Sequence, residues 1–154
     1  GQVGLQKELE IALIEAALQG FDRLPADSYL SLNVSPETIL AGAVGEVLAR
    51  QPLDRLMLEV TEHALVQDYE RLAEALEPLR REGLRLAVDD AGAGYASFRH
   101  ILKLKPDVIK LDASLIRNVD SDTGCRALAA ALEVAGARDV QTVAPDAAPE
   151  WFSA

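Results

Sequence analysis

The feature that most constrains this chain is the alternation of short apolar segments with longer amphipathic ones along most of its length. The short segments are rich in leucine and valine and end in polar or turn-forming residues, as buried strands do. The segments between them repeat apolar residues at helical spacing, and several end at glycine. Strands separated by helices favour right-handed βαβ units, so we predict an α/β fold with a parallel sheet.

The expected elements follow this alternation to about residue 143. Strands are predicted at residues 29–34, 55–61, 85–90, 106–112 and, weakly, 140–143, and helices at residues 5–20, 36–50, 69–82, 95–104 and 122–134. Gly42 and Gly45 weaken the second helix, and Pro78 should kink or shorten the third. Residues 144–154 have no period and contain prolines, so we expect an irregular tail.

Length and composition fit one domain with a hydrophobic core, and residues 1–154 are expected to form a single unit. The formal net charge of -10 argues against binding to a nucleic-acid polymer or an anionic membrane surface. No apolar run is long enough to span a bilayer, and no basic segment precedes an apolar one near the start. Cys125 is the only cysteine, which excludes an intrachain disulfide, and we expect the chain to be cytoplasmic.

Side chains that bind metals or phosphates recur where the predicted strands end. In chain order they are Asn33, then Glu59 and Glu62, then Asp89 and Asp90, then Lys110 and Asp112. The carboxyl ends of parallel strands open onto one face, so we expect these side chains to converge. Carboxylate and amide oxygens suit Mg²⁺ or Mn²⁺, and a pair of such ions can activate water for attack at phosphorus. Lys110 would then hold a water or a phosphate oxygen.

Each of these residues also has a simpler structural interpretation. Asn33 could end a strand and begin a turn, Glu59 could face solvent, and Lys110 could be an exposed strand residue. The two aspartates could belong to a polar turn, since alanine and glycine follow them directly. Repetition of the pattern at successive strand ends favours a shared site over these separate explanations.

Short motifs at these strand ends resemble those of a known family. They are Asn33-Val34-Ser35-Pro36, Leu58-Glu59-Val60-Thr61-Glu62, Ala87-Val88-Asp89-Asp90-Ala91-Gly92-Ala93-Gly94-Tyr95 and Ile109-Lys110-Leu111-Asp112. In this order and spacing they resemble the EAL-domain family of cyclic di-GMP phosphodiesterases, over about residues 5–143. The resemblance implies a modified (β/α)8 barrel that hydrolyses cyclic di-GMP to the linear dinucleotide with two Mg²⁺ or Mn²⁺ ions.

The resemblance also implies a role for each matching residue. The first metal would be bound by Asn33, Glu59 and Asp89, and the second by Asp89 and Asp90, with Asp89 bridging. The catalytic pair would be Lys110, which orients the attacking water, and Glu62, with Asp112 in support. A loop containing Gly92, Gly94 and Tyr95 would couple the metal site to a homodimer interface.

The chain departs from the family pattern in several places. Nothing before residue 5 supplies the first strand with its Glu-Ala-Leu signature, and the last two strands are absent. Ala91 and Ala93 stand where the family has Phe and Thr, and residues 143–147 lack the glutamates of the sixth strand. We therefore expect an incomplete or modified (β/α)8 barrel that lacks the first and last strands.

These departures lead to the predicted function. We expect a degenerate EAL-type domain in bacterial cyclic di-GMP signalling, which is regulatory or binds a ligand or protein rather than catalysing hydrolysis. The alternative is an active phosphodiesterase whose missing strands come from a partner chain or have been cut away. A metal-dependent barrel enzyme of aldolase or enolase type, and a barrel fragment without a ligand, are further alternatives. A homodimer and an upstream sensor domain or partner protein are the expected partners.

Overall fold

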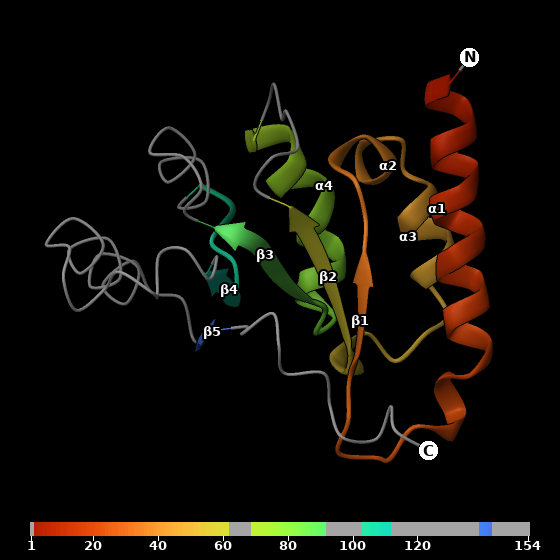
Figure 1. Cartoon of the computed structure of the whole chain (residues 1–154), viewed down its shortest axis with the longest axis vertical. Coiled ribbons are helices and arrows are strands. Elements are labelled where there is room, and N and C mark those ends of the chain that lie inside the picture. The colour runs from red at the N-terminus through yellow and green to blue at the C-terminus, as the bar shows by residue number, and fades with distance from the viewer. Residues whose placement is uncertain (1, 62–68, 92–102, 112–138, 143–154) are drawn as a thin grey trace, which may run out of the picture.

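A single parallel sheet organises the described part of the chain (Figure 1). The computed structural model describes residues 2–61, 69–91, 103–111 and 139–142. Within them the strands lie in sequence order, and every neighbouring pair is parallel. They are β1 (Leu30–Asn33), β2 (Leu56–Thr61), β3 (Arg85–Ala91), β4 (Val108–Leu111) and β5 (Asp139–Thr142). The predicted α/β class and parallel sheet are confirmed, because consecutive strands run the same way.

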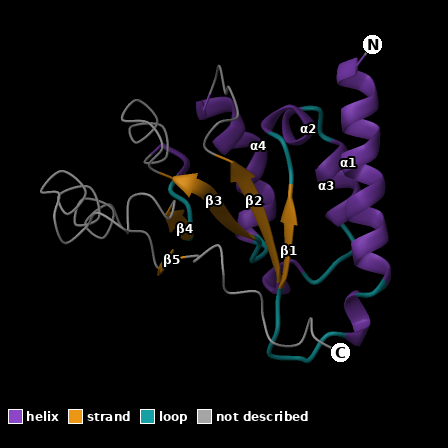
Figure 2. Ribbon diagram, in the orientation of Figure 1, coloured by secondary structure: helices purple, strands orange, loops and turns teal. Residues whose placement is uncertain are grey.

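One helix precedes β1, two connect β1 to β2, and one connects β2 to β3, as Figure 2 shows. They are α1 (Gln2–Gln19), α2 (Pro36–Leu40), α3 (Ala43–Leu48) and α4 (Tyr69–Arg81), with short 3-10 helices at Phe21–Arg23 and Leu53–Arg55. The helix expected over residues 36–50 is therefore two helices. Gly42 separates them with φ of 82°, a left-handed conformation that costs little only for glycine.

Pro78 does not end its helix, although it was expected to kink or shorten it. The helix continues to Arg81, close to the predicted end. Proline removes one backbone hydrogen bond to the preceding turn, and here that loss falls near the end of α4. The strong amphipathicity of this helix, which buries Leu72 and Leu76, compensates for the loss.

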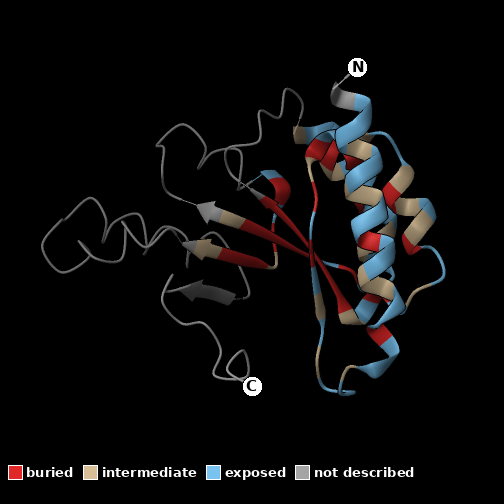
Figure 3. Cartoon of the chain, turned by 45° about the vertical axis from the view of Figure 1, so that its right-hand side comes forward, coloured by how far each residue is buried: buried red, intermediate tan, exposed pale blue. Residues whose placement is uncertain are grey.

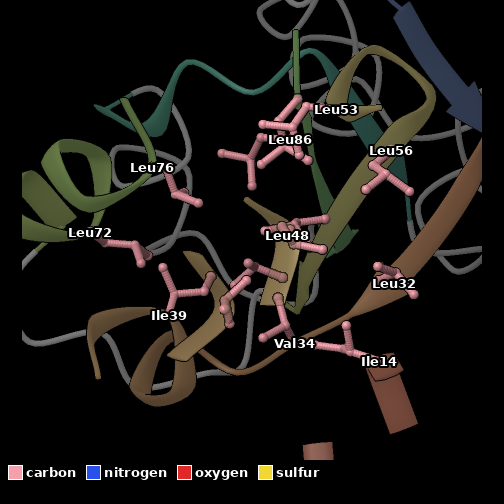
Figure 4. Packing of buried hydrophobic residues seen from close by; sticks show 14 of the residues in the cluster. Ile14, Leu32, Val34, Ile39, Leu48, Leu53, Leu56, Leu72, Leu76 and Leu86 are labelled. Atoms are coloured by element: carbon pink, nitrogen blue, oxygen red, sulfur yellow. The ribbon is translucent and has the colours of Figure 1, made fainter. Parts of the chain in front are cut away.

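The main hydrophobic core lies between one face of the sheet and the helices (Figure 4). In β1 to β4, the strand residues of this cluster point to one face of the sheet, as the strand period of two requires. Every helix contributes at least one buried apolar residue to the same cluster, as the red segments of Figure 3 illustrate. Members of this cluster include Ile14, Leu32, Ile39, Leu48, Leu58, Val60, Leu72, Leu76, Leu86, Val88 and Ile109.

The opposite face of the sheet carries a smaller apolar cluster and, beyond it, polar residues. Met57, Ala87 and Val108 form this second cluster, one from each of β2, β3 and β4. Residues two positions further along the same strands share its face. In β2 and β4 these are Glu59 and Lys110, so an apolar layer lies directly beneath the polar strand ends.

Several predicted elements lie outside the described residues. They include the helix at 122–134, most of the helix at 95–104 and the tail at 144–154. Among the helices that the structure describes, none is long and apolar enough to cross a membrane.

Candidate functional site

The carboxyl ends of β1, β2 and β3 bring the predicted site residues into adjacent register positions. Asn33 lies opposite Glu59, and Thr61 lies opposite Asp89. Residues opposite each other in parallel strands share a face of the sheet, and so do residues two positions apart in one strand, so Asp89 lies one row beyond Asn33 and Glu59 on the same face. The arrowheads in Figure 2 mark this edge. The sequence-based expectation of convergence thus holds for the positions of Asn33, Glu59 and Asp89.

Glu59 is the centre of the described site. The residue is only 6% exposed, so the interpretation in which it faces solvent is wrong. Its Oε2 accepts a hydrogen bond from Lys110 Nζ at 2.6 Å, and its Oε1 accepts one from the Ser31 hydroxyl. A buried carboxylate needs such partners, because removing the charged group from water costs on the order of several kcal/mol.

Lys110 reaches Glu59 across an entire strand. It lies on β4, whereas Glu59 lies on β2, with β3 between them. The β3 residue opposite Glu59 is Ala87, which is fully buried. Because the side chain of Ala87 is a single methyl group, it leaves room for the long lysine side chain to pass. The half-buried Lys110 is therefore not the exposed strand residue of the simpler interpretation.

The paired aspartates lie at an irregularity in the sheet. The register of β3 and β4 shifts there, so that Asp89 and Asp90 on β3 stand where β4 has Lys110 alone. One extra residue in a strand is a β-bulge, and bulges change the direction of side chains and are frequent beside active sites. Asp89 is half-buried and Asp90 belongs to β3 as well. The strand extends to Ala91, so the aspartates are not part of a turn.

A hydrogen-bond network holds the chain immediately after Asn33. The Val34 amide donates to the Glu59 carbonyl at 3.0 Å, which continues the pairing of β1 and β2. Ser35 is the N-cap of α2, and its hydroxyl accepts a bond from the Thr38 amide. The Ser35 amide and hydroxyl both donate to Glu10 Oε2, at 3.1 and 2.8 Å. These hydrogen bonds connect helix α1, which carries Glu10, to the segment directly after Asn33.

The same network shifts the ionisation of Glu10. Burial raises the pKa of this carboxyl group, but hydrogen bonds from Thr38, Ser35 and Gln6 outweigh burial. The net result is a pKa below the usual value for glutamate, so Glu10 is charged and a strong acceptor near neutral pH.

The oxygen donors at the strand ends are of the kind that a hard divalent cation prefers. Asn33, Glu59 and Asp89 offer an amide oxygen and carboxylates, which suit Mg²⁺ or Mn²⁺ rather than zinc. Among residues 2–61, 69–91, 103–111 and 139–142, no three acidic, histidine or cysteine side chains gather closely enough to hold an ion by themselves.

Sequence reasoning missed two residues of this site and placed others where the structure gives no description. Ser31 was missed because a serine at alternate spacing in a strand carries no signal of its own, and Glu10 because it lies in a distant helix. For Asp90 only the backbone is described, and Glu62, Gly92, Gly94, Tyr95 and Asp112 lie outside the described residues.

A parallel sheet flanked by helices, with acidic and amide side chains at its carboxyl edge, defines a partial (β/α)8 barrel with a candidate metal site. Comparison with known proteins gives the family. The family model for the EAL domain matches residues 2–146, so the chain belongs to the EAL-domain family.

Individual relatives agree with this assignment. The cyclic di-GMP phosphodiesterase PdeF of Escherichia coli is 29% identical over 132 residues, which cover 79% of this chain and 18% of the relative. A Klebsiella pneumoniae BlrP1 structure, a manganese and cyclic di-GMP complex, superimposes with a TM-score of 0.72 at 26% identity, over 90% of this chain and 38% of that one.

A third comparison is with an isolated domain. The EAL domain of Mycobacterium smegmatis DcpA superimposes with a TM-score of 0.68 at 28% identity, and covers 90% of this chain and 67% of its own. The chain therefore spans less than a fifth of the curated relative PdeF but most of the length of a solved EAL domain.

Proposed function

We propose that this chain is a cyclic di-GMP-binding signalling domain that acts as a regulatory or protein-binding module rather than as a complete phosphodiesterase. The observation that carries the ligand-binding part of the proposal is the contact of Lys110 with Glu59 across β3. In this contact the Lys110 ammonium group and the buried Glu59 carboxylate lie at the carboxyl edge of the sheet, beside the positions of Asn33 and Asp89. Ligands of parallel α/β folds bind at this edge.

Charge supports a metal-assisted mode of binding. Cyclic di-GMP is an anion with two phosphodiester groups, and the chain itself has a net charge of -10. A divalent cation would bridge the two negative charges, and relatives with solved structures include complexes with manganese or calcium together with cyclic di-GMP. We propose Asn33, Glu59, Asp89 and Asp90 as the residues that bind Mg²⁺ or Mn²⁺. The cation would neutralise phosphate and activate water.

The residues of this chain would then divide the remaining work. Lys110 would donate to a water or a phosphate oxygen through the hydrogen atoms not used for Glu59, since an ammonium group has three. Glu62 is proposed to act beside it, and Asp112 to support the site. Gly92, Gly94 and Tyr95 are proposed to form the loop that links the site to a homodimer interface.

The regulatory role is supported by departures inside the family match. Ala91 and Ala93 replace Phe and Thr in the loop after the paired aspartates, and residues 143–147 contain no glutamate. A metal with fewer carboxylate ligands binds less tightly and stabilises less charge at phosphorus. A cytoplasmic location and an upstream sensor domain or partner protein complete the proposal.

Hydrolysis is the second candidate function, and the position of Lys110 favours it. An ammonium group within hydrogen-bonding distance of a carboxylate at the metal site is well placed to orient a water molecule. If further barrel strands are supplied beside this segment, by a partner chain or by the rest of a longer chain, the same residues would support phosphodiester cleavage.

Calorimetric titration of cyclic di-GMP into the chain, with Mn²⁺ or Mg²⁺ present, tests the proposal. We expect saturable binding that is lost in Asp89→Ala and in EDTA, and no linear dinucleotide on chromatography of the same sample. Glu77→Gln is the matched control, because Glu77 is an exposed glutamate on α4, away from the strand ends. Linear product from the wild type would favour the second candidate, and absence of both heat and product would refute the proposal.

A further inference from the structure

We propose that Ser31 is a positioning residue for the metal site, because its hydroxyl fixes the carboxylate of Glu59 in the orientation in which Glu59 binds the cation. The inference rests on the proposed function and adds a residue to it. Ser31 itself is not a proposed ligand, so its effect is transmitted through Glu59.

The pleat of β1 places Ser31 on the correct face of the sheet. Ser31 and Asn33 are two residues apart and share one face, whereas Leu32 between them is buried in the main core on the other face. In the register, Ser31 lies opposite Met57, and Asn33 lies opposite Glu59. The serine hydroxyl therefore reaches Glu59 diagonally, within the range of neighbouring side chains on one face of a sheet.

Ser31 and Lys110 hold the carboxylate from opposite sides. Ser31 donates to Oε1 from β1, and Lys110 donates to Oε2 from β4, while Glu59 itself lies on β2 between them. A carboxylate whose two oxygens are held in different directions cannot rotate freely about its last bond. Each oxygen has two lone pairs, so one lone pair on each remains for another ligand.

The two donors differ in what they contribute. Lys110 brings a positive charge, which attracts Glu59 and repels a metal ion at the same time. Ser31 is neutral, so it orients the carboxylate without opposing the cation. Of the two donors to Glu59 that the structure describes, only the Lys110 ammonium group remains when Ser31 is removed, and the carboxylate is then free to turn toward it. Hydrogen-bond partners of metal ligands typically change metal affinity by about 10- to 100-fold when they are removed.

The experiment measures Mn²⁺ binding without nucleotide, from the electron paramagnetic resonance signal of the free ion. We expect Ser31→Ala to weaken Mn²⁺ binding by about tenfold. Ser31→Thr keeps the hydroxyl and suits a strand, so it should bind within about twofold of the wild type. Ser31 is exposed, which leaves room for the added methyl group.

Ser28→Ala is the matched control. The hydrogen bonds that the structure describes for Ser28 use its backbone: the amide donates to the Pro25 carbonyl, and the carbonyl accepts from Arg55. This variant should bind Mn²⁺ like the wild type. Circular dichroism melting of all variants shows that each is folded at the temperature of the titration, so a loss of affinity is not a loss of folded protein.

The outcomes separate this inference from the proposed function. Unchanged Mn²⁺ affinity in Ser31→Ala, with binding by the wild type, overturns the positioning role and leaves the metal site in place. Equal weakening in Ser31→Ala and Ser31→Thr also overturns it, because the hydroxyl would then not be the cause. Failure of the wild type to bind Mn²⁺ refutes the proposed metal site and this inference together.

Discussion

Two largely buried ion pairs among the described residues join segments that are distant in sequence, and they are built in different ways. Lys110 and Glu59 link β4 to β2, with side chains 19% and 7% exposed. Arg80 and Asp107 link the end of α4 to the segment before β4, with side chains 23% and 21% exposed. Both pairs are mostly buried, so burial alone does not distinguish the pair at the candidate site from the pair in the framework.

The Arg80–Asp107 pair is bonded to the backbone on both sides. Arg80 donates to the carbonyls of Leu104 and Lys105, each at 2.8 Å, as well as to Asp107 at 3.1 Å. Asp107 Oδ2 also accepts from the Leu86 amide at 3.0 Å. These contacts hold a turn in which Lys105 has φ of 45°. The pair belongs to the framework that sets the start of β4.

Within the described residues, the side chains of Lys110 and Glu59 have only side-chain partners. The other partner of Glu59, Ser31, also bonds through its side chain. The site lies at the carboxyl edge of the sheet. Backbone partners cannot be exchanged without moving a strand, whereas side-chain partners can be shared with a ligand. The comparison teaches that the kind of partner, more than the degree of burial, marks the pair that is available for binding.

The largest expected effect comes from removing one member of the pair at the site. Glu59→Leu leaves the Lys110 ammonium largely buried without its carboxylate, and we expect the free energy of unfolding to fall by about 3 kcal/mol. The double variant Glu59→Leu, Lys110→Met removes both charges and should regain most of this loss, since apolar replacements of buried pairs are often neutral. Urea denaturation of the single and double variants measures both values. A double variant as unstable as the single one would break the comparison.

The next effect concerns the framework pair. Arg80→Met removes the donors for the Leu104 and Lys105 carbonyls, and we expect a loss of about 2 kcal/mol in unfolding free energy. Here the second substitution, Asp107→Leu, should not restore stability, because it also removes the acceptor for the Leu86 amide. The same denaturation experiment gives the coupling energy of each pair. If this double variant regained as much unfolding free energy as the Glu59→Leu, Lys110→Met variant does, the distinction between the two pairs would be contradicted.

A smaller effect is expected at Glu10, whose network combines backbone and side-chain donors. Glu10→Gln should lower the unfolding free energy by about 1 kcal/mol near neutral pH, because the charge-assisted bonds from Ser35 weaken. Hydrogen bonds lower the pKa of Glu10 in the folded state despite its burial, so its contribution is complete above the pKa of the unfolded chain. The contribution is lost as the pH falls from the pKa of Glu10 in the unfolded chain to below its lower pKa in the folded state.

Urea titrations at neutral and acidic pH measure this effect. The wild type should lose more stability than Glu10→Gln over the acidic interval, and the two curves should converge at its lower end. A constant difference between the two proteins at every pH would show that the charge of Glu10 is not the cause.

The sequence predicted the strands well and the contacts between them poorly. Alternation of apolar residues places β1, β2 and β4 within a few residues of the expected ranges, because each strand buries one face against helices. The break at Gly42 was not predicted, since only the structure shows that its backbone adopts positive φ. Ser31 and the passage of Lys110 over Ala87 depend on sheet register, which couples residues that no local pattern connects.

The smallest effect is expected for an ion pair that is exposed and lies within a single helix, unlike the two buried pairs that join distant segments. Arg81 and Glu77 form an i,i+4 pair on α4, with side chains 75% and 54% exposed. Water screens such charges, and ordering the side chains costs entropy, so Glu77→Gln should change the unfolding free energy by less than about 0.5 kcal/mol. Thermal denaturation at low and high salt tests this, and both proteins should respond alike. A larger loss would mean that pair geometry outweighs burial and partner type, the two properties that rank the three pairs here.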